Sequence, residues 1–127
     1  MRLALVVHPS RPIDEPLKAL RRWAEEHSVE VVQIQSPGGS ERELAPRGEL
    51  AGDDLAIALG GDGTVLSALR VAAFGGTPVL GVACGSLGAL AAVRADGLGE
   101  ALDRFRAGDW QPRRLPALAI HPPLCDR

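Results

Sequence analysis

The stretch Leu-Ala-Ile-Ala-Leu-Gly-Gly-Asp-Gly-Thr, residues 55–64, places five apolar residues directly before a turn that contains three glycines. An unbroken apolar run of this length is typical of a strand that is buried on both faces. Residues 64–74 then have helical spacing. The stretch therefore predicts a strand, a tight turn and a helix in immediate succession, which is the repeating unit of α/β proteins.

Elements of the same kinds are predicted on both sides of this stretch. Further strands are expected in four apolar or β-branched runs, at residues 3–7, 29–34, 79–82 and 115–120. Helices are expected in two amphipathic segments, at residues 12–26 and 97–106. Asp14 is the expected N-cap of the first helix, and Pro116 places the last strand at an edge. Residues 36–54 form a long polar connection, and residues 85–93 show no clear period. The predicted fold class is α/β, with a doubly wound, mostly parallel sheet.

Composition narrows the class of protein. The 127 residues suffice for one domain, and 46% hydrophobic with 24% charged residues is a globular composition. A net charge of −2 provides no basic field for binding nucleic acid, and no apolar run approaches the ~20 residues of a membrane span. Cys84 and Cys125 are too few for a disulfide framework or a metal cluster, and no signal pattern follows Met1. These features predict a cytoplasmic protein.

The glycine turn at residues 60–64 carries the strongest chemical signal. Glycines let a backbone approach a ligand closely, and the helix that follows offers free N–H groups to a phosphate. Thr64 is expected to cap that helix. Asp62 would repel a phosphate unless it has a separate task, either accepting a proton from a hydroxyl nucleophile or helping to hold a metal ion. The alternative is a tight turn with a solvated aspartate.

A second glycine-rich segment, residues 81–88, follows the strand predicted at 79–82. Because the carboxyl ends of parallel strands meet at one edge of a sheet, this segment could form a wall of the same crevice. Close packing of its glycines against the neighbouring loop is the alternative.

Four further side chains have simpler expected roles. His8 is expected to cap a loop, and His27 is expected at the surface. Trp23 has the spacing of a core residue, and Cys84 is expected to be a small buried side chain.

Both glycine segments resemble those of one enzyme family. Residues 54–64 look like the signature shared by NAD kinases and their diacylglycerol and sphingosine kinase relatives. Residues 78–90, Pro-Val-Leu-Gly-Val-Ala-Cys-Gly-Ser-Leu-Gly-Ala-Leu, are similar to the NAD kinase pattern and differ from that of the lipid kinases. Ala83 and Ala89 depart from it, because NAD kinases usually have Asn and Phe there. The resemblance extends over nearly the whole chain and implies the fold of the NAD kinase N-terminal domain.

The resemblance implies a reaction and a set of site residues. NAD kinases transfer the γ-phosphate of ATP, or a phosphate of polyphosphate in some members, to the 2′-hydroxyl of NAD, which gives NADP. Mg²⁺ accompanies the ATP. Asp62 would accept the proton of that hydroxyl. The ligand-binding residues would be Gly60, Gly61, Gly63, Thr64, Ser67 and Gly85. Ser67 stands where some members have a basic residue.

The same resemblance implies a division of the chain. Residues 1–110 correspond to the nucleotide-binding kinase domain, and residues 111–127 to the start or remnant of the β-rich C-terminal domain of the family. An exposed apolar patch is expected where that domain docks, and it would favour a homo-oligomer. Three functions stay open: a part of an NAD kinase, a catalytically incomplete domain that binds nucleotide or a partner, and a lipid kinase relative. Activity of the short chain alone also stays open.

Overall fold

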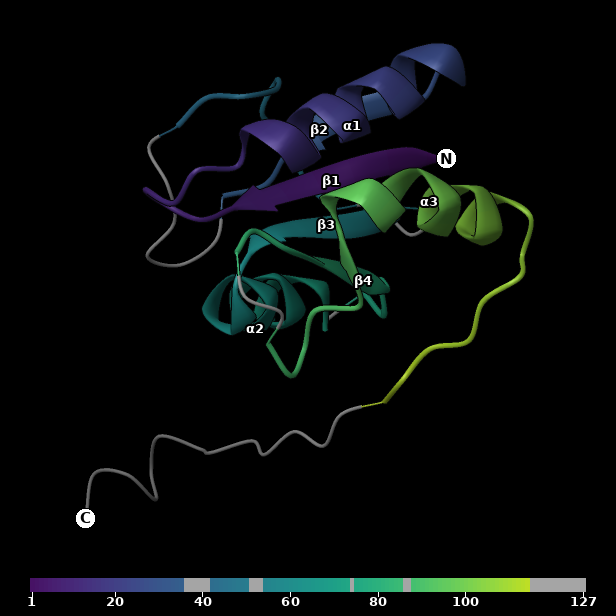
Figure 1. Ribbon diagram of the computed structural model, residues 1–127. Coiled ribbons are helices and arrows are strands. Elements are labelled where there is room, and N and C mark those ends of the chain that lie inside the picture. The colour runs from purple at the N-terminus through teal and green to yellow at the C-terminus, as the bar shows by residue number, and fades with distance from the viewer. Residues whose placement is uncertain (36–41, 51–53, 74, 86–87, 115–127) are drawn as a thin grey trace.

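Five parallel strands form one sheet in the order β2-β1-β3-β4-β5 (Figure 1). The computed structural model describes residues 1–35, 42–50, 54–73, 75–85 and 88–114. The strands are β1 (Arg2–Val7), β2 (Glu30–Gln33), β3 (Asp54–Gly60), β4 (Val79–Ala83) and β5 (Val93–Arg94). Every neighbouring pair runs parallel. This sheet confirms the predicted fold class.

Three α-helices cover both faces of the sheet. Helices α1 (Asp14–Glu26) and α3 (Leu98–Arg106) lie on one face, and α2 (Asp62–Ala72) lies on the other (Figure 1). A short 3₁₀ turn, η1 (Ala95–Gly97), leads from β5 into α3. Among the described residues, no helix combines the length and the apolar character that crossing a bilayer requires.

The two faces of the sheet differ in side-chain size. In β3, Leu55, Ile57 and Leu59 pack with the core beneath α1 and α3, whereas Ala58 packs with the core beneath α2. Because the alanine side is shallow, α2 can approach the backbone of the sheet closely. The alternation of large and small apolar residues therefore decides which face holds the close-packed helix.

Helices α1 and α3 are joined by a hydrogen bond from the Trp23 indole. Trp23 is 4% exposed, as predicted for a core residue, and its indole Nε1 donates to Asp103 Oδ1 at 2.8 Å. The ring of His27 stacks on that of Trp23 with 4.3 Å between centroids, and its side chain is 26% exposed. His27 is therefore only partly at the surface, because its ring folds onto Trp23 at the end of α1.

The predicted starts of α1 and α2 require correction. Asp14 is the first residue of α1, Ile13 is its N-cap, and no side chain caps the helix. Helix α2 begins at Asp62, two residues earlier than predicted, because the carbonyl of Gly61 accepts the N–H groups of Thr64 and Val65. Thr64 is therefore a buried residue of the first turn and not a cap.

Part of the long polar connection folds back onto the edge strand. Gln33 is buried, its Nε2 donates to the carbonyl of Arg42 at 2.6 Å, and its Oε1 accepts the N–H of Leu44 at 2.7 Å. An isolated bridge also pairs Gln33 with Arg47. The side chain and the backbone of Gln33 thus hold residues 42–48 beside β2.

Some predictions fall outside the described residues or stay untested. The strand at 115–120, Pro116 and Cys125 lie outside them. The division into residues 1–110 and 111–127, the cytoplasmic location and the homo-oligomer stay predictions. The large exposed hydrophobic side chains of the described residues are Met1, Leu66 and Trp110.

Candidate active site

The direction in which successive strands are added to the sheet reverses between β1 and β3. From β1 it continues through α1 to β2 on one side, and from β3 it continues through α2 to β4 on the other. Ligands of open α/β sheets bind at such a switch point, beyond the carboxyl ends of the strands. The loop that leaves β1 contacts the end of β3 there, since the N–H of His8 donates to the carbonyl of Leu59 at 3.0 Å.

The two glycine segments are neighbours at this edge. Strands β3 and β4 pair directly, and the N–H of Cys84 donates to the carbonyl of Gly60 at 3.1 Å. The structure therefore brings the start of the second segment beside the first, and a shared crevice stays a prediction. It also supports close packing, because a Cβ on Gly81 would lie 2.8 Å from Cγ2 of Val65.

The carboxylate of Asp62 links the glycine turn to the residues that directly follow the second segment. Its Oδ1 accepts the N–H of Leu90 at 3.0 Å, and its Oδ2 accepts the N–H of Ala89 at 3.2 Å. Gly88 leaves room for this arrangement, because a Cβ there would lie 2.4 Å from Asp62 Oδ1. The carboxylate is thus held by backbone donors and is not the freely solvated group of the alternative interpretation.

The bound carboxylate can still accept a proton. A carboxylate has about four lone-pair positions, and the two N–H groups occupy two of them. The donors fix the position of the oxygens, which a general base requires. The described residues contain no group of three His, Cys, Asp or Glu side chains that could hold a metal ion. Both roles of Asp62, the proton acceptor and the metal ligand, stay predictions.

The predicted ligand-binding glycines surround Asp62. Gly60 is buried at the end of β3, where a Cβ would lie 2.3 Å from Oγ1 of Thr64. Gly61 is extended at the N-cap of α2, and Gly63 is exposed with no atom within 4 Å of a built Cβ. Gly63 therefore leaves open space beside the turn.

The other two predicted ligand-binding residues lie farther from the turn. Ser67 is half-buried and follows Thr64 by three residues on α2, so both lie on the same side of the helix. Gly85 follows β4, is exposed and has φ +126°, a conformation that favours glycine. The roles of these residues in binding stay predictions.

The loop between β1 and α1 adds a residue that sequence reasoning missed. Nδ1 of His8 accepts the N–H groups of Ser10 at 3.1 Å and Arg11 at 2.8 Å, which confirms the loop-capping role predicted for His8. The guanidinium of Arg11 lies against Gly61, with Nη1 3.1 Å from the position of a built Cβ. No local pattern indicates this contact, because the two residues lie far apart in the sequence.

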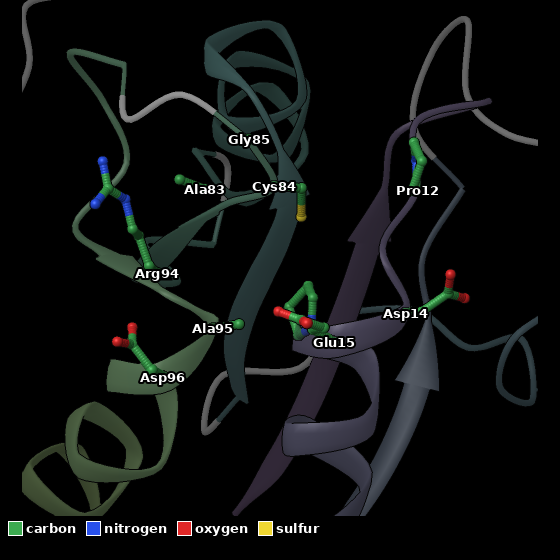
Figure 2. Close-up of a pocket in the computed structure, with 10 residues that line it drawn as sticks. Pro12, Asp14, Glu15, Ala83, Cys84, Gly85, Arg94, Ala95 and Asp96 are labelled. Atoms are coloured by element: carbon green, nitrogen blue, oxygen red, sulfur yellow. The ribbon is translucent and has the colours of Figure 1, made fainter.

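A pocket of about 500 Å³ opens next to the turn (Figure 2). Its walls come from the start of α1, the end of β4 and the β5–η1 junction. The lining residues are Pro12, Asp14, Glu15, Pro16, Ala83, Cys84, Gly85, Arg94, Ala95 and Asp96. Figure 2 shows the thiol of Cys84 pointing from the end of β4 toward the start of α1. Gly85 is the predicted site residue that this pocket shares.

Cys84 is half-buried and lines this pocket, so it is more accessible than the buried side chain that was predicted. Burial raises the pKa of its thiol, and the nearby guanidinium of Arg11 lowers the pKa by a smaller amount. The thiol is therefore protonated at neutral pH and is a poor nucleophile.

The parallel, doubly wound sheet, with a glycine turn and a fixed carboxylate at its switch point, places this chain in the class of α/β domains. The family model described as the ATP-NAD kinase N-terminal domain matches residues 3–110. The chain belongs to the NAD kinase family.

Individual relatives agree with the family match. NAD kinase 1 of Streptomyces coelicolor is 38% identical over 122 residues, which cover 94% of this chain and 34% of that protein. The NAD kinase of Heliobacterium modesticaldum is 37% identical over 115 residues, covering 86% of this chain and 40% of that protein. The NAD kinase of Koribacter versatilis is 36% identical over 110 residues, covering 83% and 39%. The chain thus spans between about a third and two fifths of the length of these relatives.

Proposed function

We propose that this chain binds the phosphates of a phosphoryl donor and supplies the proton acceptor for phosphorylation of the 2′-hydroxyl of NAD. The donor is ATP or polyphosphate, and the product is NADP. The observation that carries this proposal is the carboxylate of Asp62, which is fixed between two glycine segments at the switch point of the sheet.

The reaction joins the 2′-oxygen of NAD to the terminal phosphorus of the donor and breaks the bond from that phosphorus to the bridging oxygen. The proton of the hydroxyl passes to a free lone pair of Asp62, and ADP or a shortened polyphosphate leaves with the electron pair. Since the transferred phosphoryl group develops little covalent bonding in the transition state, the protein contributes mainly by position and charge. The open space beside Gly63 is where the dinucleotide would approach.

We treat Mg²⁺ as part of the nucleotide substrate. When bound to ATP, Mg²⁺ neutralises charge on the phosphates. At the turn, Asp62 already accepts two N–H groups, and the described part of the chain offers no cluster of three metal-binding side chains. We therefore propose that Mg²⁺ enters the site bound to ATP and is not held by protein side chains alone.

Nucleotide binding without turnover is a second candidate. The relatives named above are NAD kinases of which this chain spans 34% to 40%. Their activity belongs to chains that are longer, so binding and turnover by this chain are separate questions.

Formation of NADP from Mg-ATP and NAD by the 127-residue chain distinguishes these candidates, with binding of each substrate measured by calorimetry. Asp62→Asn removes the proton acceptor, and Asp109→Asn makes the same change at an exposed position after α3. Turnover in the wild type and in Asp109→Asn, with turnover lost in Asp62→Asn, supports the first candidate. Binding without turnover in the wild type supports the second. A folded chain that binds neither substrate contradicts both.

A further inference from the structure

The candidate site contains one basic side chain that no sequence motif indicated. Ser67 stands where some members of the family have a basic residue, and Arg70 lies in the last turn of α2, at the far end from the glycine turn. Arg11 comes instead from the loop after β1, and its guanidinium lies against the backbone of Gly61. The sheet topology thus supplies a cation to the turn from a different segment of the chain.

The charge of Arg11 is not neutralised within the described part of the protein. No carboxylate there forms an ion pair with it, whereas Arg47 and Arg104 both pair with glutamates. Arg11 is exposed, and its charge lowers the pKa of Cys84, which directly follows β4. An unpaired guanidinium between the two glycine segments is available to an anion in the crevice.

The backbone of Arg11 is held in place although its side chain is exposed. Its N–H donates to Nδ1 of His8 at 2.8 Å, and its carbonyl accepts Nη1 of Arg42 at 2.9 Å. The same Nη1 also donates to the carbonyl of His8 at 2.9 Å. This fixed loop limits the conformational freedom that Arg11 would lose on binding a ligand.

We infer that Arg11 binds the phosphate chain of the phosphoryl donor and holds it against the turn at residues 60–63. This inference rests on the proposed function and adds a binding residue to it. The ligand chemistry is a phosphoanhydride chain, which ATP and inorganic polyphosphate share. Arginine suits this task because its planar guanidinium can donate two parallel hydrogen bonds to phosphate oxygens.

Calorimetric titration of four proteins with Mg-ATP and, separately, with magnesium tripolyphosphate tests this inference. The proteins are the wild type, Arg11→Gln, Arg11→Lys and the matched control Arg70→Gln, which removes an equal charge at the other end of α2. We expect Arg11→Gln to weaken binding of both ligands by about 10- to 100-fold, because a charge-assisted hydrogen bond is lost. The affinity of Arg11→Lys should lie between those of the wild type and Arg11→Gln. The affinity of Arg70→Gln should stay within about twofold of the wild type.

The outcomes separate failure of the inference from failure of the proposed function. If the wild type binds both ligands and Arg11→Gln binds them equally well, the role of Arg11 is overturned and the proposed function stands. If Arg11→Gln loses affinity for Mg-ATP alone, Arg11 contacts the nucleoside and the phosphate assignment is overturned. If a folded wild type binds neither ligand, the proposed function fails and the inference fails with it. Because Arg11 is exposed, each variant should keep the melting temperature of the wild type within a few degrees.

Discussion

The carboxylate of Asp62 has a structural task besides its proposed chemical one. It joins the first turn of α2 to the segment between β4 and β5 through two backbone N–H groups. An asparagine at this position would keep one acceptor oxygen and would turn an NH₂ group toward the other N–H donor. A loss of activity in such a variant therefore has to be compared with its stability.

We expect Asp62→Asn to lower the free energy of unfolding by about 1–2 kcal/mol, because one hydrogen bond to a charged acceptor is lost. Urea denaturation followed by circular dichroism measures this change. Asp109→Asn, at an exposed carboxylate, should stay within about 0.5 kcal/mol of the wild type. Equal stability of all three proteins would show that the two backbone bonds contribute nothing in solution.

The thiol of Cys84 reports on the charge of Arg11. Burial disfavours the thiolate and raises the pKa, whereas the Arg11 guanidinium favours the thiolate and lowers it. Alkylation of Cys84 by iodoacetamide should therefore rise with pH through a midpoint above that of an ordinary cysteine. Arg11→Gln should move the midpoint higher still, because only the effect of burial remains. Mass spectrometry of the labelled peptides measures each cysteine separately, and an unchanged midpoint in Arg11→Gln would place Arg11 farther from Cys84.

Among the elements, α2 is the helix that packs most closely on the sheet. Gly81 in β4 permits this, since a Cβ there would lie 2.8 Å from Val65 Cγ2 and 3.1 Å from backbone atoms of Leu90 and Ala91. The backbone atoms cannot move without shifting the segment that donates to Asp62. Close packing of the second glycine segment thus positions the candidate site.

Two glycine-to-alanine substitutions should change stability in opposite directions. Gly81→Ala should lower it by about 1–3 kcal/mol, because the added methyl overpacks the contact between β4 and α2. Gly99→Ala, in α3, meets no atom within 4 Å and should raise stability by about 0.5–1 kcal/mol through helix propensity. Thermal unfolding of the two variants compares these changes, and a Gly81→Ala protein as stable as the wild type would contradict the packing account.

At the scale of the whole molecule, the larger part of the core lies between the sheet and the α1–α3 layer. The large side chains that are fully buried there include Leu3, Leu5, Ile57 and Leu102. Helix α3 contributes Leu98 and Leu102 to this core from beyond the candidate site in the sequence. The sheet that carries the site is therefore stabilised by residues far from it.

Leu102→Ala should lower the free energy of unfolding by about 2–5 kcal/mol, because it leaves a cavity under α3. Leu66→Ala makes the same change at a side chain that is 49% exposed, and it should cost less than about 1 kcal/mol. Urea midpoints of the two variants provide the comparison. Equal losses would mean that α3 is not docked on the sheet in solution.

Much of the fold could be predicted because its signals are local. The apolar runs of β1, β3 and β4 and the amphipathic spacing of α1 and α3 are properties of consecutive residues. The two-residue strand β5 was not predicted, because Val93–Arg94 pairs only through its neighbour β4. Helix starts were misplaced because Asp14 resembles a cap in sequence, whereas backbone geometry places the N-cap at Ile13.

The sequence by itself determined a parallel α/β sheet of the NAD kinase family, with a glycine turn and Asp62 at the end of a buried strand. Apolar periodicity and glycine spacing carry that information along the chain. Only the tertiary structure decided that Ala89 and Leu90 hold the Asp62 carboxylate and that Arg11 lies on Gly61. These contacts join segments distant in sequence, and their geometry depends on strand order and packing, which no local pattern records.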